Sequence, residues 1–223
     1  MVSLPTIHSK EELIALIKEL GILPAFSNHI PGFSVEDCID PAYWFPAEGE
    51  GFWEWKGPVI RESGFAYGKF FSGRAGYLSP ELYREFANYR RDGYDFDARW
   101  EEGLARRKDK LVYDVLWEEG SLLSKQLSRR VSAEDRRDFS AIMTRLQMQG
   151  YALISNFEYE LSKNGVPYGW GVTRYETPER RFGADFTEKV YAHEPAESRA
   201  ILYERLKKLL PEESEKAINK LIG

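Results

Sequence analysis

Two glutamines near the middle of the chain are the side chains whose type and spacing could carry chemistry. Gln147 and Gln149 stand in the run Leu-Gln-Met-Gln-Gly at 146–150. A neutral amide both donates and accepts hydrogen bonds, so two of them can hold a water molecule and a sugar oxygen without a charge that titrates. On a continuing helix, however, side chains two residues apart point about 200° away from each other.

A shared task for the two amides therefore requires a change in the backbone. We expect it if the helix ends at Gln147 and Gly150 lets the chain straighten, because side chains two residues apart lie on one side of a strand. Ordinary polar residues at a helix end are the alternative interpretation. The sequence therefore predicts a site only together with a bend.

Six cations form a second candidate site, for the phosphates of a nucleic acid. They lie between residues 121 and 149, where three carboxylates accompany them. The cations are Lys125, Arg129, Arg130, Arg136, Arg137 and Arg145. Such side chains can follow a phosphate backbone and position a duplex. A solvated helix face without a partner is the alternative.

Three tryptophans are candidates for stacking on an exposed base, namely Trp53, Trp55 and Trp170. Their large apolar rings suit core packing equally well, which is the alternative for each.

Other site chemistries find little support in the sequence. His8, His29, His193 and Cys38 are scattered and show no pair at metal-ligand spacing, so we expect no metal site and no nucleophilic Ser/His or Cys/His mechanism. The segment 68–75 superficially resembles a phosphate loop, but Arg and Ala stand where such a loop needs Lys and a hydroxyl. We therefore expect no cofactor.

Composition limits the class of protein. The 223 residues are 43% hydrophobic, enough for a real core, and the formal net charge of −5 argues against a protein that coats nucleic acid generally. A single cysteine fits a reducing compartment. The segment 1–23 lacks the uncharged core of a signal peptide or membrane span, so we expect a cytoplasmic protein with no membrane partner.

Capping signals and hydrophobic spacing predict the elements that must position these side chains. We expect helices at 10–20, 52–62, 80–91, 96–118 with a break near Arg106, 121–130, from Ser132 to about Leu146, 195–209 and 211–221, hairpins at 65–78 and 151–175, and an aromatic loop at 25–51. No internal repeat is apparent. From 110 to 175 the order of helix, helix, longer helix and hairpin is that of a winged helix, whose last helix often enters a DNA groove.

Two motifs resemble the AlkZ/YcaQ-type DNA glycosylases. Ser-Ala-Glu-Asp at 132–135 followed by Leu-Gln-Met-Gln resembles their first winged helix, in which a Gln-apolar-Gln or Gln-apolar-Asp motif lies in the active site. Phe-Trp-Glu-Trp-Lys at 52–56 resembles a later winged-helix unit, although the two motifs stand here in reversed order on a shorter chain. Tyr-Gly-Trp at 168–170 and Thr-Pro-Glu at 177–179 make the chain most similar to the AlkZ-related group, over most of 50–183.

The resemblance implies a DNA partner and a reaction. An exposed N-alkylated purine would be excised by hydrolysis of its glycosidic bond, with Gln147 and Gln149 placing the water. The fold that we expect is α+β, with an N-terminal helix–hairpin–helix unit at 1–95 (a candidate for a divergent second winged helix), a winged helix-turn-helix domain at 96–183, and amphipathic helices at 184–223 packed on the core.

The function that we expect is that of a DNA-binding winged-helix protein acting on duplex DNA, with alkylated bases as its target. The alternative is a non-catalytic winged-helix transcription regulator or protein-interaction module, which the acidic balance favours. Glycosylase activity and the oligomeric state stay open at this point.

Overall fold

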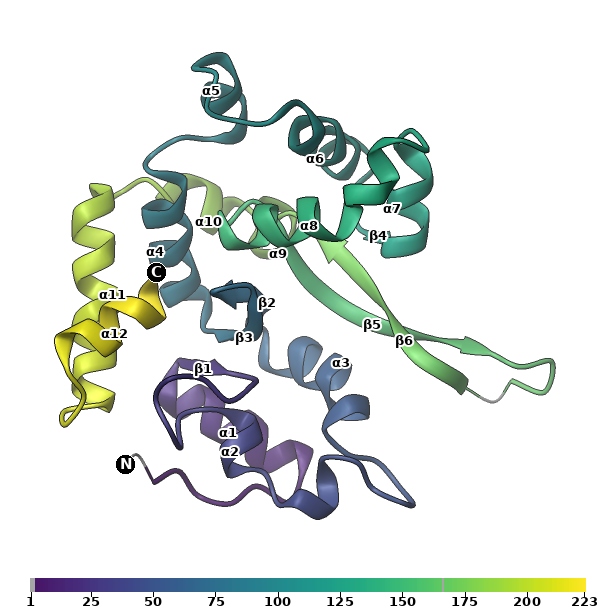
Figure 1. Cartoon of the computed structure of the whole chain (residues 1–223), viewed down its shortest axis with the longest axis vertical. Coiled ribbons are helices and arrows are strands. Elements are labelled where there is room, and N and C mark those ends of the chain that lie inside the picture. The colour runs from purple at the N-terminus through teal and green to yellow at the C-terminus, as the bar shows by residue number, and fades with distance from the viewer. Residues whose placement is uncertain (1–2, 166) are drawn as a thin grey trace.

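An antiparallel sheet joins the two halves of the chain in the computed structural model (Figure 1). The structure describes residues 3–165 and 167–223, with the backbone alone at 161, 167, 168 and 170. The strand order is β1-β3-β2-β5-β6-β4. The strands are β1 (Ile22–Pro24), β2 (Ala66–Phe71), β3 (Arg74–Leu78), β4 (Leu122–Leu123), β5 (Leu153–Leu161) and β6 (Pro167–Glu176). The mixture of helices with this sheet makes the protein α+β, as the sequence predicts.

Helices surround the sheet and the loops between its strands. They are α1 (Lys10–Leu20), α2 (Val35–Cys38), η1 (Pro41–Tyr43), α3 (Phe52–Ser63), α4 (Pro80–Arg91), α5 (Phe96–Glu101), α6 (Arg107–Glu119), α7 (Ser124–Arg130), η2 (Asp135–Asp138), α8 (Phe139–Met148), α9 (Pro178–Phe182), α10 (Ala184–Lys189), α11 (Pro195–Leu209) and α12 (Glu215–Ile222). None of those in the described ranges combines the length and apolar character needed to cross a bilayer.

The two halves repeat one order of elements. The first runs α1, β1, α2, α3, β2, β3, and the second runs α6, β4, α7, α8, β5, β6. In each, the short first strand pairs with the last, β1 with β3 and β4 with β6. The halves meet where β2 pairs with β5 at Tyr67 and Ile154, while α3 packs on β5 and α8 packs on β2. Each half therefore supplies a helix to the other half's strand.

The junction between the third helix and its hairpin shows the repeat at the level of residues. The run Gly-Phe-Ala at 64–66 follows α3, and Gly-Tyr-Ala at 150–152 follows α8. Gly64 and Gly150 both adopt a positive φ, at 74° and 78°, which costs glycine little. At Gly150 a β-carbon would also lie 2.9 Å from the α-carbon of Ala87. Two short matches so far apart are too weak to reveal the repeat in the sequence alone.

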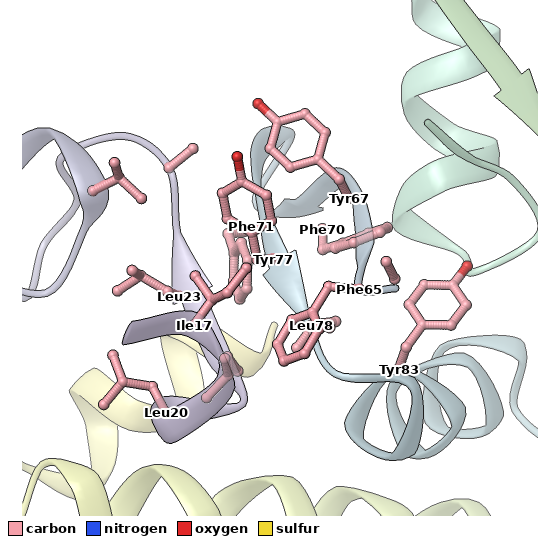
Figure 2. Packing of buried hydrophobic residues seen from close by; sticks show 14 of the residues in the cluster. Ile17, Leu20, Leu23, Phe65, Tyr67, Phe70, Phe71, Tyr77, Leu78 and Tyr83 are labelled. Atoms are coloured by element: carbon pink, nitrogen blue, oxygen red, sulfur yellow. The ribbon is translucent and has the colours of Figure 1, made fainter. Parts of the chain in front are cut away.

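Two hydrophobic clusters fill the interior. The larger one combines α1 and the sheet with α4, β5 and the last three helices. Figure 2 shows its centre, where the ring centroids of Phe70 and Tyr83 lie 5.2 Å apart. The smaller one lies within residues 96–152, between α5, α6, α7 and α8, and includes Leu116 and Leu146. α8 is therefore held by one cluster on its inner face and by β2 of the other half.

Short elements account for most differences from the predicted boundaries. β1 has three residues and β4 has two, which is too few for an alternating pattern to be recognised. The segment 121–130, predicted as one helix, therefore begins with the unpredicted strand β4. The long helix starts at Phe139 instead of Ser132, because residues 135–138 form the 3-10 turn η2. α12 starts at Glu215, where the hydroxyl of Ser214 caps it by accepting a hydrogen bond from the Ala217 N–H.

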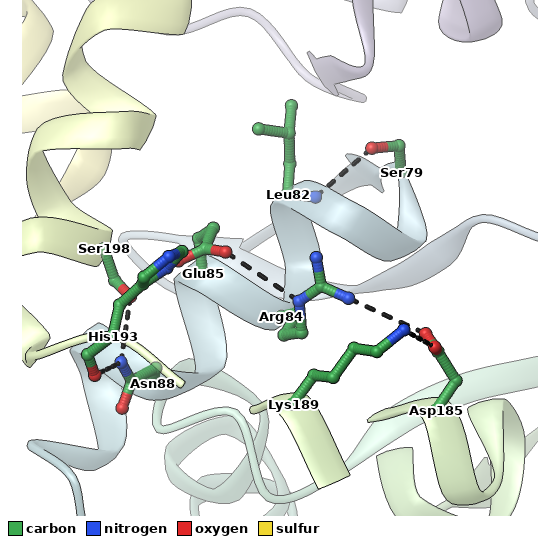
Figure 3. A network of polar contacts seen from close by, with 9 residues as sticks. All are labelled: Ser79, Leu82, Arg84, Glu85, Asn88, Asp185, Lys189, His193 and Ser198. Atoms are coloured by element: carbon green, nitrogen blue, oxygen red, sulfur yellow. Dashed lines mark hydrogen bonds and ion pairs between the residues drawn. The ribbon is translucent and has the colours of Figure 1, made fainter. Parts of the chain in front are cut away.

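A polar network connects α4 to the C-terminal helices (Figure 3). The buried carboxylate of Glu85 accepts a hydrogen bond from Ser198 Oγ at 2.7 Å and lies 3.0 Å from His193 Nδ1. Asn88 Nδ2 donates to Ser198 Oγ at 2.9 Å and to the His193 carbonyl at 2.7 Å. By its hydrogen bond and its charge, Glu85 raises the pKa of His193 above its ordinary value of 6.5.

This pair predicts how stability depends on pH. A histidine whose pKa is raised by folding contributes stability that is fully present below its unfolded pKa and is lost as pH rises through the folded pKa. The melting temperature is therefore expected to fall as pH rises above 6.5. In His193→Asn or Glu85→Gln this part of the fall should disappear, as thermal melts over a pH series would measure. An identical pH profile in wild type and both variants would contradict the assignment.

Candidate functional site

The bend that a shared glutamine site requires does not occur after Gln147. α8 continues through Met148, and the Gln149 N–H donates to the Arg145 carbonyl at 2.8 Å. The chain leaves the helix one residue later, at Gly150, where the Tyr151 N–H closes the end on the Leu146 carbonyl. A glycine in the left-handed region ends the helix after the second glutamine, so the two amides keep their helical separation.

Gln147 is fully buried and its amide already has partners. Its Oε1 accepts a hydrogen bond from the Lys69 N–H of β2 at 3.1 Å, and its Nε2 donates to the Met143 carbonyl at 2.8 Å. Gln149 occupies the C-cap of α8 and is only partly buried. The two side chains therefore do not face a common open hollow. Gln147 joins α8 to the sheet strand of the other half.

Gly150, next to this motif, is held by a buried cation. Arg91 is 1% exposed and donates to the Gly150 carbonyl from Nε and Nη2, at 3.2 and 2.8 Å. Its Nη1 donates to the Tyr191 hydroxyl at 3.0 Å and lies 2.8 Å from Glu179 Oε1. One guanidinium thus ties α4 to the end of α8, to α9 and to the segment after α10.

The outer side of α8 borders a basic hollow of about 440 Å³. Its lining consists of Arg106, Arg107, Lys108, Asp138, Ala141 and Arg145. Arg107 and Lys108 belong to the first turn of α6, a helix end that no side chain caps and that carries partial positive charge. The Lys108 ammonium, 2.7 Å from Asp138, holds the pKa of that carboxyl below its usual range. Behind this lining, Asp135 lies 3.6 Å from Lys108, and Asp109 is paired with Arg145. The hollow together with these neighbours therefore holds four cations against three carboxylates, a small net positive charge.

One further cation, Lys69 of β2, contacts α8. It donates from Nζ to Thr144 Oγ1 at 3.0 Å, whereas Arg74 at the start of β3 donates to the Ser27 carbonyl. The turn between β2 and β3 abuts the helix, since a β-carbon on Gly73 would lie 3.7 Å from Thr144 Cγ2. The exposed face of α8 therefore has Lys69 beside it in addition to the cations of the hollow.

The six predicted cations have different surroundings. Lys125 and Arg130 form ion pairs with Glu160 and Glu119, and Arg145 is bonded to the buried Asp109 while lining the hollow. Arg129, Arg136 and Arg137 are exposed. Sequence reasoning missed residues 106–108, although three consecutive cations at a helix start are a recognisable signal.

Two of the three predicted stacking tryptophans, Trp53 and Trp55, pack against residues of the first half. Trp55 is 5% exposed and packs against Tyr43, with ring centroids 5.6 Å apart. Trp53 is partly buried, with Phe45 stacked on it at 5.7 Å and Lys56 Nζ 4.2 Å from its ring, where burial lowers the pKa of Lys56 to about 8. The side chain of Trp170 lies outside the described residues. These contacts are those of packing in the first half.

No group of three or more His, Cys, Asp or Glu suited to a metal ion occurs within the described ranges. In comparisons with known proteins, the family model described as "AlkZ related" matches residues 7–223. No curated protein and no solved structure matches the chain.

Proposed function

This chain belongs to the AlkZ-related family, and we propose that it binds duplex DNA along the exposed face of α8. The observation that carries the proposal is the basic hollow beside that helix, which four cations line and to which the uncapped start of α6 adds partial positive charge. Phosphate contacts of this kind position a duplex against a helix.

The order of elements supports the same geometry. We propose that both halves are winged helices, since each has a helix, a strand, two helices and a hairpin whose last strand pairs with the first. The third helix is the one that enters the major groove in such modules. In the second half this helix is α8. We propose residues 1–95 and 96–183 as the two units, with residues 184–223 forming helices that pack on them.

The local charge favours α8 over α3 as the helix that contacts DNA. α8 lies beside residues 106–108 and is contacted by Lys69 of β2. α3 instead exposes Arg61 next to Glu62. An acidic protein can bind DNA through one basic face, because the contacts that matter lie within about 10 Å of the phosphates at moderate salt.

Charge reversal in the hollow tests this function. Arg106→Glu combined with Arg107→Glu should weaken binding to a short duplex by roughly 10-fold to 100-fold at low salt, because two phosphate contacts become repulsive. The slope of log affinity against log salt should fall by about two. Fluorescence anisotropy with a labelled duplex measures both quantities.

A control with the same change in charge separates local from general effects. Lys208→Glu combined with Lys216→Glu reverses two exposed cations on α11 and α12, away from the hollow. This control should bind like wild type. Equal loss in both double variants, or no binding by wild type at low salt, would remove the proposal.

Excision of an alkylated base needs a separate assay. With Gln147 buried and bonded, Gln149 is the member of the pair that solvent can reach. Release of alkylpurine from methylated duplex, lost in Gln149→Ala without loss of DNA binding, would add hydrolysis to the function proposed here. Binding without release identifies a non-catalytic DNA-binding protein.

A further inference from the structure

A second cavity, of about 540 Å³, lies on another face of α6 from the one that packs on α8. The face toward α8 carries Asp109, Val112 and Leu116, whereas the cavity is lined by Tyr113 and Trp117 of α6 together with residues of α5, α9 and α10. A volume of this size suits a small organic ligand. The cavity is independent of the DNA surface proposed above.

Aromatic rings form one wall of this cavity as a continuous stack. Phe96 and Tyr113 are stacked with centroids 4.1 Å apart, and Trp117 follows Tyr113 at 6.0 Å with an angle of 27° between the rings. Trp117 is the last ring of the series and is 51% exposed. A further planar ring can therefore extend the stack on its open side.

The charge of the lining is strongly negative. Five carboxylates face the cavity, namely Asp95, Asp97, Asp114, Glu118 and Glu179, against two cations. Both cations already have partners. Arg91 bonds Gly150, Tyr191 and Glu179. Lys110 forms ion pairs with Asp97 and Asp114. A cation in the cavity would gain from this field and an anion such as a DNA phosphate would be repelled.

Glu179 supplies a fixed negative charge to the lining of the cavity. Its Oε1 is held by Arg91 at 2.8 Å, and its Oε2 is buried without a hydrogen-bond partner among the described residues. Because that oxygen is closed to solvent, a ligand in the cavity does not bond to it directly. The carboxylate instead attracts a cation in the cavity through its charge at short range.

We propose that this cavity binds a planar aromatic cation. The ring stacks on Trp117, where the face of the indole favours a positive charge, and the charge is directed toward Glu179. Neither a neutral ring nor a non-aromatic cation makes both interactions. Aromatic wall and carboxylate lining together thus define the class of ligand.

Isothermal titration calorimetry with N-methylquinolinium and its neutral counterpart quinoline tests the proposal. N-methylquinolinium should bind at one site, at least about tenfold more tightly than quinoline, since only the cation gains the carboxylate field. Added salt should weaken the binding of the cation. Equal affinity for the two compounds, or no binding of the cation at millimolar concentration, overturns the proposal.

Variants place the site within the cavity. Trp117→Ala removes a half-exposed ring and should reduce affinity at least about tenfold, and Glu179→Gln should do the same, while circular dichroism verifies the fold. Trp100→Ala removes an exposed tryptophan of α5 that does not line the cavity, so it should leave binding unchanged. Unchanged binding in Trp117→Ala, or equal loss in Trp100→Ala, contradicts the assignment.

Discussion

Arg91→Met is expected to lower the free energy of unfolding by about 3–5 kcal/mol, which is the usual cost of removing one partner of a buried ion pair. The substitution removes two donors from the Gly150 carbonyl and leaves the largely buried Glu179 carboxylate without its cation. The cation also lies 4.6 Å from the Tyr151 ring centre, a contact that methionine replaces only in part. Urea denaturation monitored by circular dichroism measures the loss.

A double-mutant cycle attributes this loss to the pair. The loss of unfolding free energy in Arg91→Met combined with Glu179→Gln should be smaller than the sum of the two single losses, by about 1–3 kcal/mol. Each single substitution leaves one buried charge without its partner, whereas the double variant leaves none. Arg129→Met makes the same replacement at an exposed arginine and should change stability by less than about 0.5 kcal/mol. Additive effects of the two buried substitutions would show that the ion pair is not what holds this junction.

Gln147→Ala is expected to lower the free energy of unfolding by roughly 2–4 kcal/mol. The change leaves the Lys69 N–H in β2 without its acceptor and creates a cavity between α8 and the sheet. The loss arises in the folded scaffold, so any fall in DNA binding should follow the fraction of protein unfolded. Parallel denaturation and anisotropy measurements on the same preparation separate the two effects.

The neighbouring glutamine is the matched control. Gln149→Ala truncates the same side chain at the helix C-cap, where it is only partly buried, and should cost less than about 0.5 kcal/mol. If Gln147→Ala proved as stable as wild type, the amide would not be the link between the two halves. A fully folded Gln147→Ala that no longer binds DNA would point instead to a direct role in the interface.

Local patterns in the sequence were enough to predict the main elements. Capping residues and i, i+3, i+4 spacing placed α1, α4 and α11, because those signals act within a few residues of the chain. The hairpins at 66–78 and 153–176 followed from alternation and turn residues in the same way. Membership of the AlkZ-related family was also recognisable, since its motifs are short runs such as Leu-Gln-Met-Gln.

Which side chains meet was decided by the tertiary structure. Gln147 and Gln149 have the same chemistry in the sequence, yet one is buried against a strand 78 residues away while the other caps a helix. The repeat of the two halves is seen in the matching strand pairs β1–β3 and β4–β6. The position of residues 106–108 beside α8 likewise comes from the packing of α6. The physical reason is that burial and hydrogen-bond partners come from segments distant in the chain, whereas local propensity contains no information about which segments will pack together.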